Sequence, residues 1–516
     1  MGNVNPRKAG VLLSYVNLII NTVIPFFYTP IMLNILGQSE YGLYSLSNSV
    51  ISYLSLLQFG MGAAVIRYIA KYRATGEKEK MSQIAGLFTV IYIFLALLVL
   101  IVGLGFMFLS PMIFKNGLNS QEISKMRLLI IIMTLSTAFS FISVVFSSII
   151  NAYERFVFKR VTDIILTICA PIFNLFVLFL GFQSVGMATV SLVTQVVILP
   201  VNIRYVYKRI GLKLAFVKPP KSLLKELFSF SIFMFLSSVA DLLFWSTDNV
   251  LIGAMIGSAA VAVYNVGGVF TSLMRNLTTA INDVFVPKVT MMVAVDDSVE
   301  ELSELMVRVG RLQYLMVSIL SSGFIVFGQV FIYYWSGDIY ADAYWVSLVT
   351  FLPSAIPILQ NIAFGVIVAQ HRHKFRCCVY FGIAILNAVS TFLVIPYYGY
   401  MGAAICSGVS YIIGHGLILN IYYRRVIKLD IFNFWINILK MSVVPVIMTI
   451  VGYIFVNVII PWNLFGMLVE GFIFVCIFVV FTWVFSMNQY EKSIFIGLFK
   501  NLNIIGQLKS LKRGER

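Results

Sequence analysis

Of the 516 residues of this chain, 60% are apolar and only 11% are charged. Soluble globular proteins carry about 25% charged residues, so this composition excludes an ordinary soluble protein and indicates one with many membrane spans. The net charge of +16 would favour nucleic acid in a soluble chain, but in a membrane protein the basic residues report topology, and we expect no nucleic-acid partner.

Long apolar runs between polar breaks predict the membrane spans, because about 20 helical residues cross a hydrocarbon core of about 30 Å. The first run follows Arg7 and Lys8, has no small-residue cleavage site, and is interpreted as a retained span. The fold class we predict is therefore an all-α integral membrane protein of fourteen transmembrane helices. The spans lie near 10–35, 43–69, 84–110, 126–150, 161–182, 187–207, 229–253, 261–286, 310–336, 343–370, 377–396, 401–423, 435–459 and 464–486.

The basic residues predict which side of the membrane each break faces. With the N-terminus in the cytoplasm, 32 of the 37 lysines and arginines lie in cytoplasmic breaks and tails, and Arg275 and Lys440 lie inside spans. The external breaks hold Lys115, Lys125 and Arg127. Because cytoplasmic loops of membrane proteins are enriched in Lys and Arg, this bias predicts that both termini are cytoplasmic.

Three short patterns recur in the same order at offsets of about 216 to 220 residues, which indicates an internal repeat. The first pair is Leu36-Gly37-Gln38 followed by Leu43-Tyr44-Ser45-Leu46, which recurs as Ile256-Gly257-Ser258 followed by Val263-Tyr264-Asn265-Val266. The other two pairs are Ala152-x-x-Arg155-x-x-Phe158-Lys159 with Ala369-x-x-Arg372-x-x-Phe375-Arg376, and Gly186-x-Ala188-x-x-Ser191 with Gly402-x-Ala404-x-x-Ser407. We infer two six-helix lobes in a parallel repeat, followed by a C-terminal helix pair. The predicted domains are the N-terminal lobe at 1–207, a basic cytoplasmic linker at 208–226, the C-terminal lobe at 227–423, and two extra helices with a cytoplasmic tail at 424–516.

Two consecutive predicted spans carry ionisable side chains within their apolar runs. Asp241 and Asp248 lie in one, and Arg275 and Asp283 lie in the next. A charge at the centre of a membrane helix costs at least about 2.5–3.5 kcal/mol, so we expect these groups to face a partner or a watery cavity. They are the first candidates for a functional site.

Three stretches resemble signature segments of a known family: LGQSEYGLYSL, STDNVLIGAMIGSAAVAVYNV and IPYYGYMGAAICSGVSYIIGH. They are similar to the polysaccharide-flippase (Wzx-like) branch of the MOP exporter superfamily, and the similarity covers essentially the whole chain. The resemblance implies a bacterial inner- or plasma-membrane flippase that moves undecaprenyl-diphosphate-linked oligosaccharide from the cytoplasmic to the external leaflet by alternating access. It also implies surface polysaccharide assembly as the purpose, membrane lipids and other assembly proteins as partners, and Na⁺ or H⁺ as the coupling ion, without a cofactor.

Asp241 and Asp248 lie seven residues apart and would share one helix face, with Trp245 between them. By similarity to ion-coupled relatives, one hypothesis is an ion-coupling site that Asn387 and Thr391 complete. The alternative is that Asp248 lies at the external headgroup edge while Asp241 bonds only neighbouring Ser or Asn side chains.

Arg275 is the first candidate for the diphosphate of the substrate, because guanidinium matches phosphate oxygens bidentately and stays charged. The alternative is a structural pair with Asp241 or Asp283. Arg67 is a second candidate for the same ligand, or an ordinary interface residue. Two further residues complete the predicted substrate site, Asn21, which the repeat aligns with Asp241, and Trp245.

No pattern in the chain predicts catalysis: it has no nucleophile elbow, phosphate-binding glycine loop or Asp-x-Asp pair. The five cysteines lie in apolar segments and predict neither disulfides nor a zinc site. His371 and His373 are surrounded by basic residues without a nearby carboxylate, so we expect no metal site there. We therefore expect a transporter and not an enzyme.

Two other functions are alternatives to the flippase. A MATE-like exporter of small molecules or drugs shares the predicted fold, but an exporter of cationic drugs needs carboxylates in its cavity and the spans hold few. A membrane-embedded glycan polymerase or ligase typically displays a large external loop for its chemistry. The longest external break here is only about Pro111 to Lys125.

Overall fold

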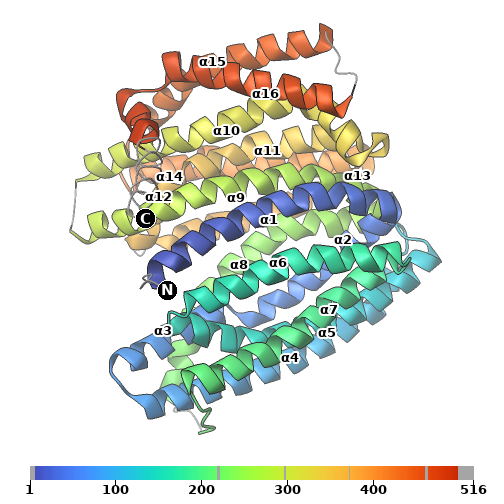
Figure 1. The fold of residues 1–516 in the computed structure, drawn as a ribbon, viewed down its shortest axis with the longest axis vertical. Helices are drawn as coiled ribbons and strands as arrows, with labels where there is room; N and C mark the ends of the chain where they lie inside the picture. The colour runs from blue at the N-terminus through green and yellow to red at the C-terminus, as the bar shows by residue number, and fades with distance from the viewer. Residues whose placement is uncertain (1–5, 218–220, 296–297, 371, 459–462, 498–516) are drawn as a thin grey trace, which may run out of the picture. The chain divides into compact units, whose positions relative to one another are not determined.

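The computed structural model describes residues 6–217, 221–295, 298–370, 372–458 and 463–497, and all secondary structure in these residues is helical (Figure 1). Eleven helical segments within the described residues are long and apolar enough to cross a membrane. The α-helices up to residue 294 are α1 (Pro6–Leu36), α2 (Gln38–Ser52), α3 (Met61–Ala74), α4 (Lys78–Ile113), α5 (Ser120–Ala152), α6 (Phe156–Phe179), α7 (Gln183–Tyr205), α8 (Lys221–Met255) and α9 (Ser258–Ala294). They are followed by α10 (Val299–Ser336), α11 (Ala343–Leu359), α12 (Asn361–Ala369), α13 (His373–Tyr411), α14 (Asn420–Arg425), α15 (Ile431–Val458) and α16 (Leu464–Phe481).

Contacts group the chain into two compact units. The first consists of Met1–Val269 with Lys374–Ser410, and the second of Phe270–His373 with Tyr411–Arg516, as far as each is described. By this grouping α8 and the beginning of α9 belong with the N-terminal helices. The predicted lobe boundaries follow the sequence repeat instead of contacts, and they stay a prediction.

In the first unit, α5 is the central helix and packs against α4, α7 and α3 (Figure 1). The core beneath it contains fully buried Phe88, Phe141 and Ile149. Between lipid-embedded helices the hydrophobic effect gives little net attraction, so close packing of small residues has to hold them together. Gly103 of α4 is such a residue, because a Cβ there would lie 2.3 Å from the Thr134 side chain of α5.

The opposite face of α4 carries large exposed apolar side chains. Ile101 is 67% exposed and Phe108 is 68% exposed. Exposure of this kind would be unfavourable in water and is expected where lipid is the solvent. The two faces of α4 thus match a helix that packs on protein on one side and on lipid on the other.

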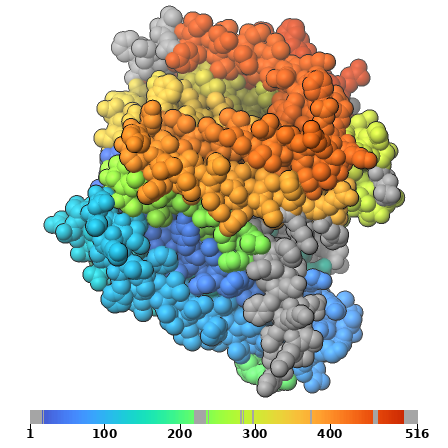
Figure 2. Space-filling model, turned by 180° about the vertical axis from the view of Figure 1, so that it is seen from behind, coloured from blue at the N-terminus to red at the C-terminus, as the bar shows by residue number. Residues whose placement is uncertain are grey.

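In the second unit, α10 packs against α15, α11 and α16. The space-filling view shows one face of this unit, formed by its yellow, orange and red segments (Figure 2). A buried ion pair fixes the segment after α16 to α10: Nε of Arg311 donates to Oε1 of Glu491 at 2.5 Å, and the guanidinium also donates to the Ser486 carbonyl at 3.0 Å. Because both charges are buried, the loss of either partner would leave the other uncompensated.

The predicted spans fall on helices wherever the chain is described, but some of these helices are broken. Within the predicted span 43–69, α2 gives way to a 3₁₀ turn (Tyr53–Gln58), and Phe59 and Gly60 adopt left-handed conformations before α3 begins. The predicted spans 377–396 and 401–423 form one helical stretch, Phe375–Arg425, that reverses at Gly399. The number of fourteen spans stays a prediction.

The recurring glycines of the sequence repeat have similar surroundings. A Cβ on Gly186 would meet Phe182 at 2.7 Å and Val177 at 3.1 Å, and one on Gly402 would meet Val394 at 2.8 Å and Tyr398 at 3.1 Å. In both places glycine allows the chain to fold back tightly on the residues that precede it. The similar surroundings of these two glycines agree with the sequence repeat, but they do not establish how the lobes are arranged.

The contact between α4 and α5 can be tested with a matched pair of substitutions in α4. Gly103→Val would place a branched side chain against Thr134, whereas Gly105→Val meets nothing within 4 Å. We expect Gly103→Val to lower the free energy of unfolding by about 1–3 kcal/mol, as overpacking does, and Gly105→Val to change it much less. Thermal unfolding of the purified proteins measures both, and equal midpoints would contradict the proposed packing.

Candidate functional site

A buried carboxylate, Asp248, forms the centre of the candidate site. It lies seven residues before the end of α8 and is 1% exposed. The Tyr264 hydroxyl of α9 donates to its Oδ2 at 2.6 Å, and the Ser407 hydroxyl of α13 donates to the same oxygen at 2.7 Å. The amide nitrogen of Asn387, also on α13, lies 3.5 Å from Oδ1. Three helices of the first unit therefore converge on one carboxylate.

Asn387 extends this cluster, because its amide nitrogen donates to Ser407 Oγ at 3.2 Å and its oxygen accepts from Ser410 at 3.2 Å. The fully buried Thr391 hydroxyl lies beside Asp248 without a hydrogen bond of ordinary geometry. We call these residues the Asp248 cluster: Asp248, Tyr264, Asn387, Thr391, Ser407 and Ser410. All its donors and acceptors are oxygen atoms apart from the one amide nitrogen.

The reversal of α13 at Gly399 is what assembles the cluster. Asn387 and Ser407 are 20 residues apart, which would separate them by about 30 Å on a straight helix. They touch because the backbone at Gly399 has φ 58° and ψ −147°, a conformation that residues with a Cβ avoid. A single glycine thus brings the two arms of α13 to the same carboxylate.

No basic residue compensates Asp248 within the described chain, since none of the ion pairs formed there includes it. An ionised carboxylate buried without a partner charge costs several kcal/mol. Asp248 is therefore suited to hold either a proton or a small cation. The neighbouring oxygens of Asn387, Thr391 and Ser407 are the ligand type that hard cations prefer.

The chemistry of the cluster is unlike that of a transition-metal site. Among the described residues there is no group of three or more His, Cys, Asp or Glu side chains that could hold a metal ion. With one carboxylate and otherwise neutral oxygens, the Asp248 cluster can balance a single positive charge. This matches a proton or a monovalent cation better than a tightly held divalent ion.

The structure brings Asp248, Asn387 and Thr391 together, as the ion-coupling hypothesis requires, but it separates Asp241 from them. Asp241 is exposed on α8 while Asp248 is buried, so the two carboxylates do not share one environment. Trp245 lies edge-on to Phe244 with ring centroids 5.9 Å apart. Asp248 is buried within the protein, while its depth in the membrane stays a prediction.

The other predicted substrate residues lie on exposed helix faces. Asn21 donates to the Asn17 carbonyl at 2.8 Å, Arg67 is exposed on α3, and Arg275 is exposed on α9. None of them belongs to the Asp248 cluster, and their contacts with a substrate stay a prediction. The side chain of Asp283, the alternative partner of Arg275, lies outside the described residues.

Sequence reasoning missed three members of the cluster: Tyr264, Ser407 and Ser410. Tyr264 and Ser407 belong to segments that marked the internal repeat, in Val263-Tyr264-Asn265-Val266 and Gly402-x-Ala404-x-x-Ser407. The sequence thus marks these two segments, but only as members of a repeat. Nothing in the local sequence shows that Ser407 contacts Asp248, 159 positions away.

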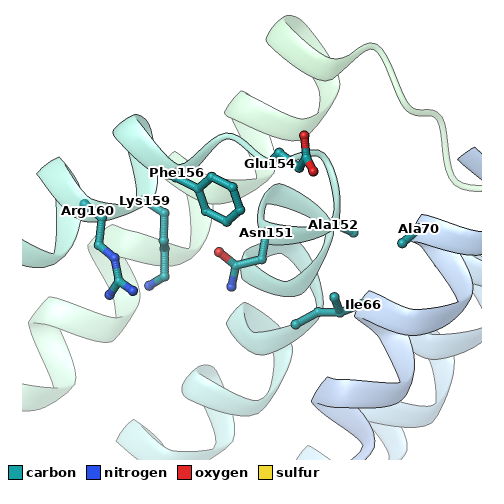
Figure 3. A pocket seen from close by; sticks show the side chains of 8 residues that line it. All are labelled: Ile66, Ala70, Asn151, Ala152, Glu154, Phe156, Lys159 and Arg160. Atoms are coloured by element: carbon teal, nitrogen blue, oxygen red, sulfur yellow. The ribbon is translucent and has the colours of Figure 1, made fainter. Parts of the chain in front are cut away.

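A separate pocket of about 470 Å³ lies where α3, the end of α5 and the start of α6 meet (Figure 3). Lys159 and Arg160 point the same way into it, while Glu154 points away (Figure 3). Lys159 pairs with Asp163 at 2.6 Å, and Arg160 lies 3.9 Å from the same carboxyl group. Asp163 therefore compensates part of the positive charge that Lys159 and Arg160 bring to this pocket.

Comparison with known families identifies the group to which this protein belongs. Residues 8–293 match the family described as "Polysaccharide biosynthesis protein". The chain belongs to this family. No curated protein sequence matches the chain significantly.

Solved structures show which fold this family member adopts. The chain is similar to "Lipid II flippase MurJ, inward closed conformation", with a TM-score of 0.71 and 14% identity over 92% of this chain and 98% of that one. It is also similar to an inward-facing multidrug resistance MATE family transporter of the MOP superfamily, with a TM-score of 0.59 and 14% identity over 79% and 96%. An outward-facing MATE transporter gives a TM-score of 0.57 and 15% identity over 83% and 97%.

These similarities confirm that the chain belongs to a polysaccharide biosynthesis family and has the fold that MurJ and MATE transporters share. The protein is a multi-pass membrane protein with a MurJ- and MATE-like fold, and its described secondary structure is all helical. The identities of about 14% establish the fold and not the cargo. The cargo and the coupling ion have to be argued from the site.

The role of Gly399 in assembling the site gives a prediction on stability. Gly399→Val should lower the free energy of unfolding by about 1–3 kcal/mol, because valine must adopt a backbone conformation that its Cβ disfavours. Gly382→Val on the same helix meets nothing within 4 Å and serves as the matched control. Thermal unfolding of both purified variants measures the effect. If Gly382→Val is destabilised as much as Gly399→Val, the loss of stability does not come from the reversal at Gly399.

Proposed function

We propose that this protein is a flippase that moves undecaprenyl-diphosphate-linked oligosaccharide from the cytoplasmic to the external leaflet of a bacterial cell membrane. The cargo is used to assemble surface polysaccharide, together with other proteins of that process. Translocation proceeds by alternating access and is driven by Na⁺ or H⁺ bound at the Asp248 cluster. Both termini lie in the cytoplasm.

The proposal of ion coupling rests on one observation: the Asp248 carboxylate on α8 is buried without a compensating charge, among hydroxyl and amide groups of α9 and α13. With a proton or cation bound, the cluster is neutral and α8, α9 and α13 are held together. Without it, the buried negative charge destabilises this packing by several kcal/mol. An ion gradient can therefore bias a conformational equilibrium, since the ion binds one arrangement better than the other.

The cargo assignment rests on the family and on chemistry. The chain belongs to a polysaccharide biosynthesis family, and one protein with the same fold is a flippase of lipid II. Arg275, with Arg67 as a second candidate, is proposed to contact the diphosphate, and Asn21 and Trp245 to contact other parts of the cargo. Asp241 is proposed to take part in ion coupling as an exposed carboxylate on the same helix as Asp248.

A MATE-like exporter is the second candidate, because two of the similar structures are multidrug transporters. Such a protein would use the same cation site with a different cargo. The two functions differ in what the purified protein moves: a lipid-linked diphosphate sugar or a soluble cationic drug.

Coupling can be tested by flipping in proteoliposomes that contain a fluorescent undecaprenyl-diphosphate-linked N-acetylglucosamine. We expect Asp248→Asn to lower the gradient-driven rate at least about tenfold, because the amide cannot bind a proton or balance a cation; tenfold corresponds to about 1.4 kcal/mol. Asp338→Asn removes an exposed carboxylate before α11 and should leave the rate unchanged. Wild-type gradient dependence in Asp248→Asn would remove the cluster from coupling, and transport of a cationic drug in place of the lipid would favour the exporter.

The diphosphate contact can be tested by binding of undecaprenyl diphosphate to the purified protein. Charge-assisted hydrogen bonds contribute about 1.5–3 kcal/mol, so Arg275→Ala should weaken binding about ten- to hundredfold. Arg275→Lys should restore only part of it, because lysine keeps the charge but not the bidentate geometry. Arg308→Ala removes an exposed arginine that pairs with Glu304 and is the control. Unchanged binding in a folded Arg275→Ala protein would exclude Arg275 from the substrate site.

A further inference from the structure

A second cavity of the first unit, of about 380 Å³, is polar but carries no charge. We call it the tyrosine–asparagine pocket, and it lies among α1, α2, α6, α7 and α9. It is lined by Tyr28, Met32, Tyr41, Tyr44, Ser45, Asn48, Ser49, Ser52, Asn174, Met187 and Asn265. Nine of these side chains end in a hydroxyl or an amide, and the other two are methionines. No residue among them is ionisable at neutral pH.

Part of the hydrogen-bonding capacity of this pocket is not used within the protein. The Tyr28 hydroxyl lies beside Asn174, yet neither this hydroxyl nor the Asn174 amide oxygen has a hydrogen bond of ordinary geometry, and both atoms are buried. Buried polar atoms without partners cost about 1–3 kcal/mol each. Tyr28 and Asn174 both line the pocket, so these two atoms are placed where a polar ligand could supply the missing hydrogen bonds.

The size and accessibility of the pocket agree with a small ligand. Its volume lies near the lower end of the range of about 300–1,000 Å³ that is typical of small-molecule sites. One water molecule takes about 30 Å³, so the pocket is much larger than a site for a single water. Asn48, which lines it, is exposed, so a ligand can reach it from the surface.

The lining chemistry points to an uncharged sugar. Each asparagine amide offers two donors and an acceptor, which can pair with neighbouring hydroxyls of a sugar ring. Tyrosine rings present a large apolar face together with a polar tip, which suits a ring with both C–H faces and hydroxyls. A phosphate, a carboxylate or a cationic drug would be left without an opposite charge here and would bind poorly.

We propose that the tyrosine–asparagine pocket binds an uncharged sugar ring of the transported oligosaccharide. This inference rests on the proposed flippase function and adds a site for the glycan itself, separate from the diphosphate contacts proposed above. The pocket selects neutral sugar rings through hydroxyl and amide groups and stacking on tyrosine.

The pocket is joined directly to the Asp248 cluster. Asn249 donates to Asn265 Oδ1 at 3.3 Å and Asn265 donates back to Asn249 Oδ1 at 2.9 Å, while Asn249 also donates to Ser49 Oγ at 3.0 Å. Asn265 and Ser49 line the pocket. The preceding residue on each helix, Asp248 and Tyr264, belongs to the cluster. Adjacent residues of α8 and α9 thus serve the two sites.

The test measures binding of soluble methyl glycosides to the purified full-length protein in nanodiscs by saturation-transfer NMR. The probes are the methyl glycosides of glucose, galactose and N-acetylglucosamine, and methyl glucuronide is the charged counterpart. We expect wild type to bind at least one neutral glycoside and to bind the glucuronide more weakly. Tyr28→Phe and Asn48→Ala should each weaken binding about two- to tenfold, the range expected for the loss of one neutral hydrogen bond.

Tyr92→Phe is the matched control, because the Tyr92 hydroxyl is also buried without a hydrogen bond in the same unit but does not line the pocket. It should leave glycoside binding unchanged. Tyr28→Phe should also keep the wild-type unfolding temperature, since its hydroxyl makes no bond within the protein, so a lower affinity cannot be ascribed to misfolding. The proposal is overturned if no neutral glycoside binds, if the glucuronide binds as well, or if Tyr28→Phe and Asn48→Ala bind like Tyr92→Phe.

The outcomes also separate this proposal from the proposed function. Glycoside binding in the pocket without any flipping of the lipid-linked probe would refute the flippase function and leave the pocket as a sugar site. Flipping that depends on Asp248 without glycoside binding would refute the pocket alone.

Discussion

The burial of the Asp248 carboxylate is the constraint on which the rest of this site depends. A carboxylate that is 1% exposed inside a membrane-embedded unit requires donors close by, and Tyr264 and Ser407 supply them at 2.6 and 2.7 Å. These residues come from α9 and α13, so the requirement ties three helices together. Because neutral donors satisfy the oxygens without balancing the charge, the cluster stays sensitive to protons and cations. The proposed ion dependence and the packing of these three helices thus have the same cause, the buried charge of Asp248.

The helices around Asp248 approach closely because glycine is placed at their contacts. A Cβ on Gly42 of α2 would lie 1.7 Å from the Ser258 carbonyl oxygen at the start of α9, and one on Gly117 would lie 2.1 Å from the Gly253 carbonyl oxygen of α8. Ser258 is also held by Glu122 of α5, which accepts its hydroxyl at 2.5 Å. Since lipid gives helices little hydrophobic reason to associate, such close approach and polar bonds between helices replace it. They hold the α8–α9 turn and therefore the end of the helix that carries Asp248.

Asn249 and Asn265 give the Asp248 cluster and the tyrosine–asparagine pocket a common structural element. Any rearrangement of α8 against α9 that follows ion binding at Asp248 also moves this pair of amides, which are bonded to each other at 2.9 and 3.3 Å. By thermodynamic linkage, a ligand that stabilises one arrangement of these helices changes the affinity of the other site by the same factor. The proposed coupling of an ion gradient to a glycan needs such an element. The consecutive residues Asp248 and Asn249 on α8, with Tyr264 and Asn265 on α9, would supply it.

Hydropathy, read from the sequence, was enough for the membrane class and for the helical nature of the described spans, because it is a sum over local properties of the chain. The topology that the basic residues predict stays a prediction. Short motifs were enough for the family, and Asp248, Asn387 and Thr391 were named as candidates because ionisable and polar residues are costly in a span. Only the tertiary structure decided that Asp241 is exposed while Asp248 is buried, and that Tyr264, Ser407 and Ser410 complete the cluster. Which polar groups face each other depends on helix rotation and on the reversal at Gly399, which joins residues 20 positions apart that a straight helix would separate by about 30 Å. Hydropathy carries no information on that rotation or reversal. The uncharged pocket could not be predicted for the same reason: single serine, tyrosine and asparagine residues in a span do not indicate a binding site, and only the tertiary structure shows that five helices bring them together.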